Sequence, residues 1–247
     1  MAGYANKIIV TLHANNFLSV EDNGRGIPVD INKTTKLSAV ETVFTVLHAG
    51  GKFDDDAYKT AGGLHGVGSS VVNALSDVLI CQVYRDKKIH EAKFMTGGKI
   101  VQSLKIVGDT QKQGTKVLFH PDPLIFKDLK FNVATIKERL LESSFLFEGL
   151  DIEFIDEINK TKQKFISNNG ISDFVQYLTK NKVATSPVIY FNDKTQNIPV
   201  NVAFQYTDEI NDMIISFANS VKTIEGGSHV NGFKSGLVSA INNYAQK

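Results

Sequence analysis

The sequence predicts an α+β fold in which helices are segregated from a mostly antiparallel sheet. Four short strand-like segments follow one another closely between residues 78 and 119, and such spacing favours antiparallel pairing. Ser38 and Glu41 are spaced as a helical capping box, and apolar residues follow them at helical spacing. With 247 residues, of which 42% are hydrophobic and 21% charged, the chain can bury an ordinary globular core.

The first elements are a β-hairpin and two helices. Strands are expected at 8–12 and 17–20 around a turn at 15–16. The first helix begins at the capping box, continues until Gly50, and carries its apolar face on Val40, Val43, Phe44 and Leu47. A second helix is expected at 69–76, directly after a cluster of glycines.

The middle of the chain reads as a run of strands followed by a helix. Strands are expected at 78–84, 89–94, 100–107 and 115–119, with turns at 86–88 and 97–98. An amphipathic helix begins at Asn132 and includes Ile136, Leu140 and Leu141.

The pattern changes near residue 182, where we expect a domain boundary. Before it come a hairpin of 152–155 with 163–167 and a helix at 171–179. After it come strands at 188–191, 199–206 and 213–221 and a final helix from about His229. The predicted domains are therefore 1–182 and 183–247.

Composition excludes several classes of protein. The net charge is +1, with 27 basic and 26 acidic residues, so this chain alone should not bind DNA tightly. No apolar run is long enough to span a bilayer and no signal peptide is visible, so we expect a soluble, cytoplasmic protein. A single cysteine, Cys81, excludes an internal disulfide and any zinc site built on several thiolates. The alternating Lys160, Lys162 and Lys164 are expected to form one solvated strand face.

A carboxylate followed by two glycines marks the first candidate site. Asp22 ends a predicted strand, and Gly24 and Gly26 follow within four residues. Taken alone, the segment is more typical of an Asx turn with a solvated Arg25. In the functional interpretation, ionised Asp22 accepts a hydrogen bond from the exocyclic amino group of a purine, and the glycines let the backbone approach the base.

A second glycine-rich segment directly precedes the predicted helix at 69–76. It runs Gly62, Gly63, Leu64, His65, Gly66, Val67, Gly68. Such a loop can present several backbone N–H groups to a phosphate chain. It is neither a Walker A loop nor a GxGxxG loop, because Ser69 replaces the expected lysine and residue 71 is valine. His65 is interpreted either as a phosphate donor or as a packed or solvated loop residue.

Three further segments complete the candidate site. Lys52 follows the first predicted helix and is the favoured counter-charge for phosphate. Asp54, Asp55 and Asp56 are conceivable metal ligands, but a solvated loop is favoured, and no metal site is assigned. Thr115 begins a predicted strand, from which its hydroxyl could reach a base.

Together these motifs resemble a known family. The segments are DNGRGIP at 22–28, TVLHAGGKF at 45–53, GGLHGVGSSVVNALS at 62–76 and GT at 114–115. In this order and spacing they resemble the ATPase region of bacterial type IIA topoisomerases, the ATP-binding subunits of DNA gyrase and topoisomerase IV. Segments near 59–60, 121–126 and 221–223 are more similar to topoisomerase IV. The superfamily also includes ninety-kilodalton heat-shock chaperones, histidine kinases and mismatch-repair ATPases.

The resemblance implies a fold and a set of roles. It implies helices on a mixed sheet, followed from about residue 183 by the start of a transducer domain. Asp22 and Thr115 would hold adenine, with Ile27, Pro28 and Val43 as walls. Lys52 and the backbone of 64–68 would hold the phosphates of ATP, and Arg25 and Arg85 would contact competitive inhibitors. In the full enzyme, Mg²⁺, DNA, a DNA-cleaving partner subunit and ATP-driven homodimerisation are implied.

The resemblance also implies what these 247 residues lack. In the family, a helix before the first strand carries the general-base glutamate and a magnesium-binding asparagine, whereas Met1–Tyr4 matches only the turn after that helix. We therefore expect an N-terminally truncated, monomeric chain that binds ATP with little hydrolysis and has no catalytic residue of its own. The alternatives are a chaperone-like or mismatch-repair ATPase of the same superfamily, or a glycine-rich scaffold without a ligand.

Overall fold

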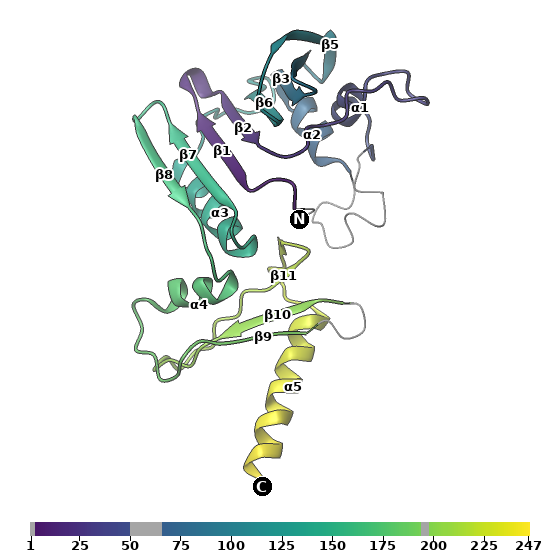
Figure 1. Ribbon diagram of the computed structural model, residues 1–247. Coiled ribbons are helices and arrows are strands. Elements are labelled where there is room, and N and C mark those ends of the chain that lie inside the picture. Colours follow the sequence, from purple (N-terminus) through teal and green to yellow (C-terminus); the bar gives the residue numbers. More distant parts are fainter. Residues whose placement is uncertain (1–2, 50–65, 194–197) are drawn as a thin grey trace.

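The chain forms one large sheet and a smaller C-terminal assembly (Figure 1). The computed structural model describes residues 3–49, 66–193 and 198–247. The strands of the large sheet are β1 (Lys7–Leu12), β2 (Leu18–Asp22), β3 (Ser76–Arg85), β4 (Lys88–Met95), β5 (Lys99–Asp109), β6 (Gly114–Pro121), β7 (Asp151–Asp156) and β8 (Thr161–Phe165). Their order is β5-β4-β3-β6-β2-β1-β7-β8. The predicted α+β class is confirmed.

The sheet is mixed because one pair of neighbouring strands is parallel. β1 pairs antiparallel with β2 through a short 3-10 turn, η1 (Ala14–Asn16), as the hairpin prediction required. On its other side β1 pairs parallel with β7, with Val10 opposite Phe154. The parallel pairing requires a crossover, and helix α3 (Val133–Leu146) lies between β6 and β7 in the chain.

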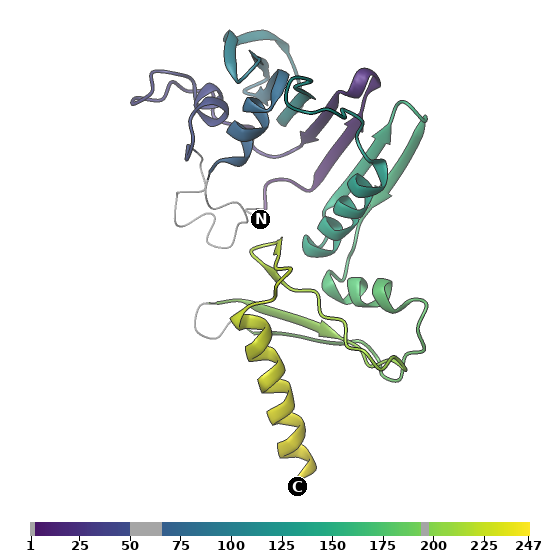
Figure 2. The ribbon, with the colours of Figure 1, turned by 180° about the vertical axis from the view of Figure 1, so that it is seen from behind.

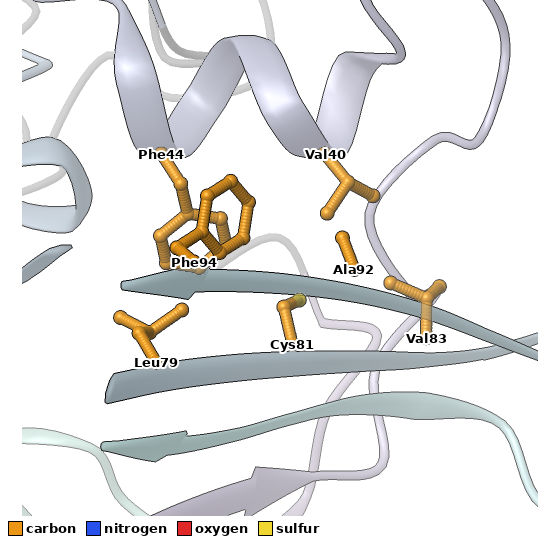
Figure 3. Close-up of a cluster of buried hydrophobic side chains, with 7 residues drawn as sticks. All are labelled: Val40, Phe44, Leu79, Cys81, Val83, Ala92 and Phe94. Carbon is orange, nitrogen blue, oxygen red and sulfur yellow. The ribbon is translucent and has the colours of Figure 1, made fainter. Parts of the chain in front are cut away.

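Helix α1 (Ala39–Thr45) covers the β3–β4 part of the sheet. Its Val40 and Phe44 point onto the sheet in Figure 3, where they meet side chains of both strands. The buried cluster comprises Val40, Phe44, Leu79, Cys81, Val83, Ala92 and Phe94. Alternate residues of β3 enter this core because successive strand side chains point to opposite faces.

The capping box is confirmed, but the predicted length of this helix is wrong. Ser38 Oγ accepts a hydrogen bond from the backbone N–H of Glu41, and Glu41 Oε2 accepts one from the backbone N–H of Ser38. The helix ends at Thr45 instead of near Gly50, since Val46 is extended at φ −109° and ψ 125°. β-Branched residues at 42, 43, 45 and 46 favour extended backbone, and His48 adopts a positive φ of 60°.

Helix α2 and helix α3 extend the helical layer. Helix α2 (Gly68–Ala74) is shorter than predicted, because β3 already begins at Ser76. Helix α3 packs on a second buried cluster around β1, β2 and β7 through apolar residues that include Ile136, Leu140 and Leu141. Its Asn132 side chain caps the first turn by accepting a hydrogen bond from Thr135 N–H.

The C-terminal elements are α4 (Ile171–Thr179), β9 (Ile189–Asp193), β10 (Val200–Phe204), β11 (Phe217–Ala218), β12 (Val221–Lys222) and α5 (Ser228–Ala245). Helix α5 extends away from the large sheet to the C-terminus in both views (Figures 1 and 2). The predicted single strand at 213–221 is wrong. Asn219 and Ser220 have φ of 49° and 66°, and this turn folds β11 back onto β12.

Candidate functional site

Asp22 lies at the end of β2, beside β6. Its Cα pairs with that of Thr115 across the ladder, and its side chain is half-buried. The carboxylate Oδ1 accepts a hydrogen bond from Gly24 N–H at 2.8 Å. Burial raises the pKa of Asp22, although hydrogen bonds from the backbone of Gly24 and Thr115 partly oppose this. The site therefore contains a partly desolvated carboxylate with remaining acceptor capacity.

The Thr115 hydroxyl links β6 to the loop after Asp22. Ile27 N–H donates a hydrogen bond to Thr115 Oγ1 at 3.3 Å, and Thr115 is only 7% exposed. A hydroxyl and a carboxylate thus lie on paired positions of neighbouring strands. Both are groups that can bind the polar edge of a planar base.

Two glycines allow the loop to pack this closely. Gly26 has a φ of +73°, and a Cβ there would lie 3.0 Å from Val83 Cγ1 and 3.1 Å from the Gly114 carbonyl oxygen. Gly114 itself has a φ of +133°, and a Cβ there would overlap the backbone carbonyl of Asp22. Gly24 is buried, and a Cβ there would crowd the Asp22 carboxylate. The Asp22–Gly26 turn therefore depends on backbone contacts that side chains would block.

The residues expected to form the apolar walls of the adenine pocket differ in their exposure to solvent. Ile27 and Val43 are partly buried and pack against the first core cluster. Pro28 is exposed. Ile27 and Val43 thus connect the loop after Asp22 to the core beneath α1.

Arg25 and Arg85 line a cavity of about 360 Å³ together with Asp86, Lys87, Lys112 and Gln113. Arg85 Nη1 donates to the Gly26 carbonyl oxygen at 3.4 Å, and the Arg25 guanidinium lies 4.0 Å from the centroid of the Tyr4 ring. Lys112 pairs with Glu21 at 2.8 Å. The cavity is predominantly basic and adjoins the glycine turn after Asp22.

Residues 66–68 are the described part of the second glycine-rich segment. Gly66 has a φ of +59°, Val67 is the N-cap residue of α2, and Gly68 is the first residue of that helix. A Cβ on Gly68 would meet no atom within 4 Å. The other predicted phosphate-binding residues lie outside the described residues: Lys52, Gly62, Gly63, Leu64 and His65.

The acidic segment at 54–56 also lies outside the described residues. Within the described ranges, no group of three or more His, Cys, Asp or Glu side chains is placed to hold a metal ion.

Motif reasoning overlooked residues that hold the Asp22 loop in place. Asn23 Oδ1 accepts hydrogen bonds from the backbone N–H groups of Asn6 and Lys7, which ties the loop to the start of β1. The Tyr4 ring contacts the Arg25 guanidinium. Gly114, the first residue of the GT pair, packs against the backbone carbonyl of Asp22. The position of Asn23 directly after the candidate Asp22 was the one available signal, because Asn side chains commonly bond nearby backbone groups.

The mixed eight-stranded sheet with helices on one face forms a two-layer α+β sandwich. The family described as histidine kinase-, DNA gyrase B- and HSP90-like ATPases matches residues 1–124, and the chain belongs to this family. The family described as DNA gyrase B matches residues 170–247.

Individual relatives agree with this assignment. The chain is 49% identical to the B subunit of DNA topoisomerase 4 from Mycoplasma capricolum and 49% identical to the B subunit of DNA gyrase from Thermotoga maritima. Each match includes 100% of this chain, which spans 38% and 40% of those relatives.

A solved structure shares the fold. The 43K ATPase domain of Thermus thermophilus gyrase B, in complex with an aminocoumarin, matches with a TM-score of 0.84 and 34% identity. The match covers 99% of this chain and 63% of that one. Over its whole length, the chain is thus similar to the ATPase region of type IIA topoisomerase B subunits.

None of the helices that the structure describes is both long enough and apolar enough to cross a membrane.

Proposed function

We propose that this chain binds ATP and that Asp22 selects the adenine base. The observation that carries the proposal is the half-buried Asp22 carboxylate on the position paired with Thr115. An ionised carboxylate accepts hydrogen bonds but donates none, so it favours the exocyclic amino group of adenine over the carbonyl oxygen of guanine. Gly24, Ile27, Pro28 and Val43 complete the proposed base pocket.

The proposed phosphate site is the glycine loop that precedes α2. Gly66, Val67 and Gly68 are its described end, and Lys52 with residues 62–65 would complete it. The positive φ of Gly66 supports this role, because a left-handed residue can turn successive N–H groups toward one anion.

We assign the chain to a complete protein that couples ATP binding and hydrolysis to DNA strand passage. DNA, a DNA-cleaving partner subunit and a second copy of the same ATPase chain are its proposed partners, in the cytoplasm. A topoisomerase IV subunit is preferred over gyrase because the segments near 121–126 and 221–223 resemble it more closely. We further propose a domain boundary at 182/183, with residues 183–247 starting the transducer domain.

The 247-residue chain alone is proposed to be a monomer that hydrolyses ATP slowly. Two carboxylates near the sequence motifs are already engaged: Glu21 pairs with Lys112, and Glu41 is bonded to Ser38. Lack of a positioned general base costs about 10²- to 10⁴-fold in rate. Substantial turnover by this chain, abolished by replacing one of its own carboxylates, would contradict the proposal.

Magnesium belongs to the complete enzyme in this proposal. Among the described residues, no group of three or more His, Cys, Asp or Glu side chains is placed to hold a metal ion. Mg²⁺ at nucleotide sites is held by few side chains together with the phosphates, and this chain's proposed part is to bind and orient the nucleotide.

Arg25 and Arg85 are the proposed contacts for competitive inhibitors. Their basic cavity of about 360 Å³ adjoins the glycine turn after Asp22 and supports binding of ligands larger than adenine. The Thermus thermophilus gyrase B domain, which shares this fold, was solved with an aminocoumarin.

Titration calorimetry tests the adenine assignment. ATP should bind and GTP should not, and Asp22→Ala should weaken ATP about ten- to 150-fold, the cost of leaving a buried polar group unpaired. Asp30→Ala, at an exposed carboxylate of the same loop region, is the matched control and should leave affinity unchanged. Equal binding of ATP and GTP would exclude the adenine site.

A further inference from the structure

The elements that follow α4 meet the large sheet at a joint built around that helix. We call β9, β10, β11, β12 and α5 the C-terminal unit. Helix α4 contacts both sides of the joint: its Phe174 ring stacks on Phe145 of α3 at 4.9 Å, and its Thr179 Oγ1 donates to Gln205 Oε1 at 2.7 Å. A change of angle between the two parts, the large sheet and the C-terminal unit, must therefore rearrange contacts near α4.

The β11–β12 hairpin contacts both α3 and α4. Phe217 and Lys222 are directly paired across the hairpin, so their side chains share one face. The Phe217 ring lies 6.4 Å from that of Phe174. Lys222 Nζ lies 2.9 Å from Glu142 Oε1 on α3. The same face of the hairpin thus makes one apolar and one ionic contact.

Glu142 is well placed to hold the hairpin. Its side chain is only 12% exposed, and its other oxygen accepts a hydrogen bond from Arg139 Nη1 at 3.0 Å. Lys222 is 40% exposed, so its ammonium is still partly hydrated. The acceptor is therefore fixed on α3, whereas the donor can exchange its partner for water.

The hairpin is also connected to α5. Thr223 N–H donates to the Ser216 carbonyl oxygen at 2.8 Å, and Thr223 Oγ1 lies 3.2 Å from Nε2 of His229 in the first turn of α5. A shift of the hairpin should therefore be transmitted to α5.

The joint is open instead of close-packed. A groove of about 450 Å³ lies between α3, α4, β8 and the hairpin, with Leu141, Tyr177 and Ile215 among its lining residues. The two parts are thus held by discrete contacts around an open groove, which leaves room for them to move.

We propose that the β11–β12 hairpin is a latch that fixes the C-terminal unit against the large sheet, with the Glu142–Lys222 ion pair as its releasable contact. Opening exchanges this ion pair for water while Phe217 leaves the α4 aromatic cluster. The inference concerns the chain's own conformational equilibrium and holds whether or not the chain binds ATP.

Pulsed electron spin resonance on the full 247-residue chain tests the latch. Spin labels on Thr161→Cys in β8 and Asn243→Cys in α5 report the distance between the two parts, and buried Cys81 stays unlabelled. We call the molecules whose β8–α5 distance differs from that of the latched state the displaced population. Lys222→Gln and Glu142→Gln should each enlarge this population about two- to five-fold, the effect expected of a partly exposed ion pair. The double variant should resemble either single variant, and Lys222→Arg should resemble wild type.

The matched control is Lys234→Gln, which breaks an ion pair with Asp212 inside the C-terminal unit. It should leave the distance distribution unchanged. A wild-type distribution in Lys222→Gln, or an equal change in Lys234→Gln, would overturn the latch. If a variant fails to fold, salt titration of the labelled wild-type chain decides, because screening should enlarge the displaced population and an unchanged distribution would refute the proposal.

Discussion

Gly114 lies directly against the backbone carbonyl of Asp22, so close that a Cβ on residue 114 would overlap the carbonyl carbon and oxygen. The contact joins the start of β6 to the end of β2 at the residue proposed to bind adenine. Since φ at Gly114 is +133°, a side chain there would be strained even without the overlap.

Gly114→Ala should therefore impair both stability and nucleotide binding. We expect a loss of about 1–3 kcal/mol in the free energy of unfolding from backbone strain. ATP affinity should fall about tenfold or more because Asp22 must shift. Denaturant unfolding and calorimetry measure the two effects. Gly108→Ala is the control, since its Cβ would meet only Ile89 Cδ1 at 3.7 Å; equal effects of both variants would contradict the argument.

Asp22→Asn should separate stability from binding. Burial raises the pKa of Asp22, so the ionised carboxylate destabilises the folded chain at pH 7. The sign follows from proton binding: the stability associated with a raised carboxyl pKa is present below the unfolded value of 3.8 and is lost as pH rises through the folded value. The Asp22→Asn variant should thus have a higher melting temperature at pH 7 and weaker ATP binding, with the thermal difference shrinking below pH 3.8. A lowered melting temperature at pH 7 would contradict this prediction.

The effect of Glu41→Gln on stability at pH 7 should be opposite in sign to that of Asp22→Asn, because the pKa of Glu41 is lowered, not raised. Burial alone would raise the pKa of Glu41, but hydrogen bonds from Ser38, Ser103 and Leu104 outweigh it and lower the pKa below 4.5. Its stabilisation is therefore present above pH 4.5 and is lost as pH falls through the folded pKa. At pH 7 the variant should lose about 1–2 kcal/mol of unfolding free energy.

Chemical denaturation at several pH values checks the Glu41 prediction, and the deficit should shrink below pH 4.5. Glu138→Gln, at an exposed carboxylate of α3, serves as the control. A deficit in Glu41→Gln that is independent of pH would show that the carboxylate charge plays no part.

Gly68→Ala should weaken phosphate binding without disturbing the fold. The added methyl group meets no atom within 4 Å, and alanine favours a helix by about 1 kcal/mol over glycine. We expect an unchanged or higher melting temperature, with ATP weakened about tenfold and adenosine unaffected. Calorimetry with both ligands measures the difference.

Gly66→Val provides the comparison for Gly68→Ala, because residue 66 has a φ of +59° and valine there is strained. This variant should weaken ATP more than adenosine while also lowering the melting temperature. Equal losses of ATP and adenosine in Gly68→Ala would show that the loop serves the fold alone.

Local sequence patterns account for the elements whose cause lies within a few residues. The β1–β2 hairpin follows from two short apolar runs on either side of Asn15 and Asn16, and the Ser38–Glu41 capping box needs residues only three apart. The candidate site was also readable in part, because Asp22, Gly24 and Gly26 lie within five residues.

Contacts between residues far apart in the chain became visible in the folded structure. The parallel β1–β7 pairing, the Gly114 contact with Asp22 and the Glu142–Lys222 ion pair join segments far apart in the chain. Local propensity contains no information on such pairings, since they depend on which buried faces and backbone groups meet after the sheet has assembled. The apolar periodicity of α1 continues to Leu47, but the helix ends at Thr45 and Leu47 is exposed, so periodicity alone overstated the length of the helix.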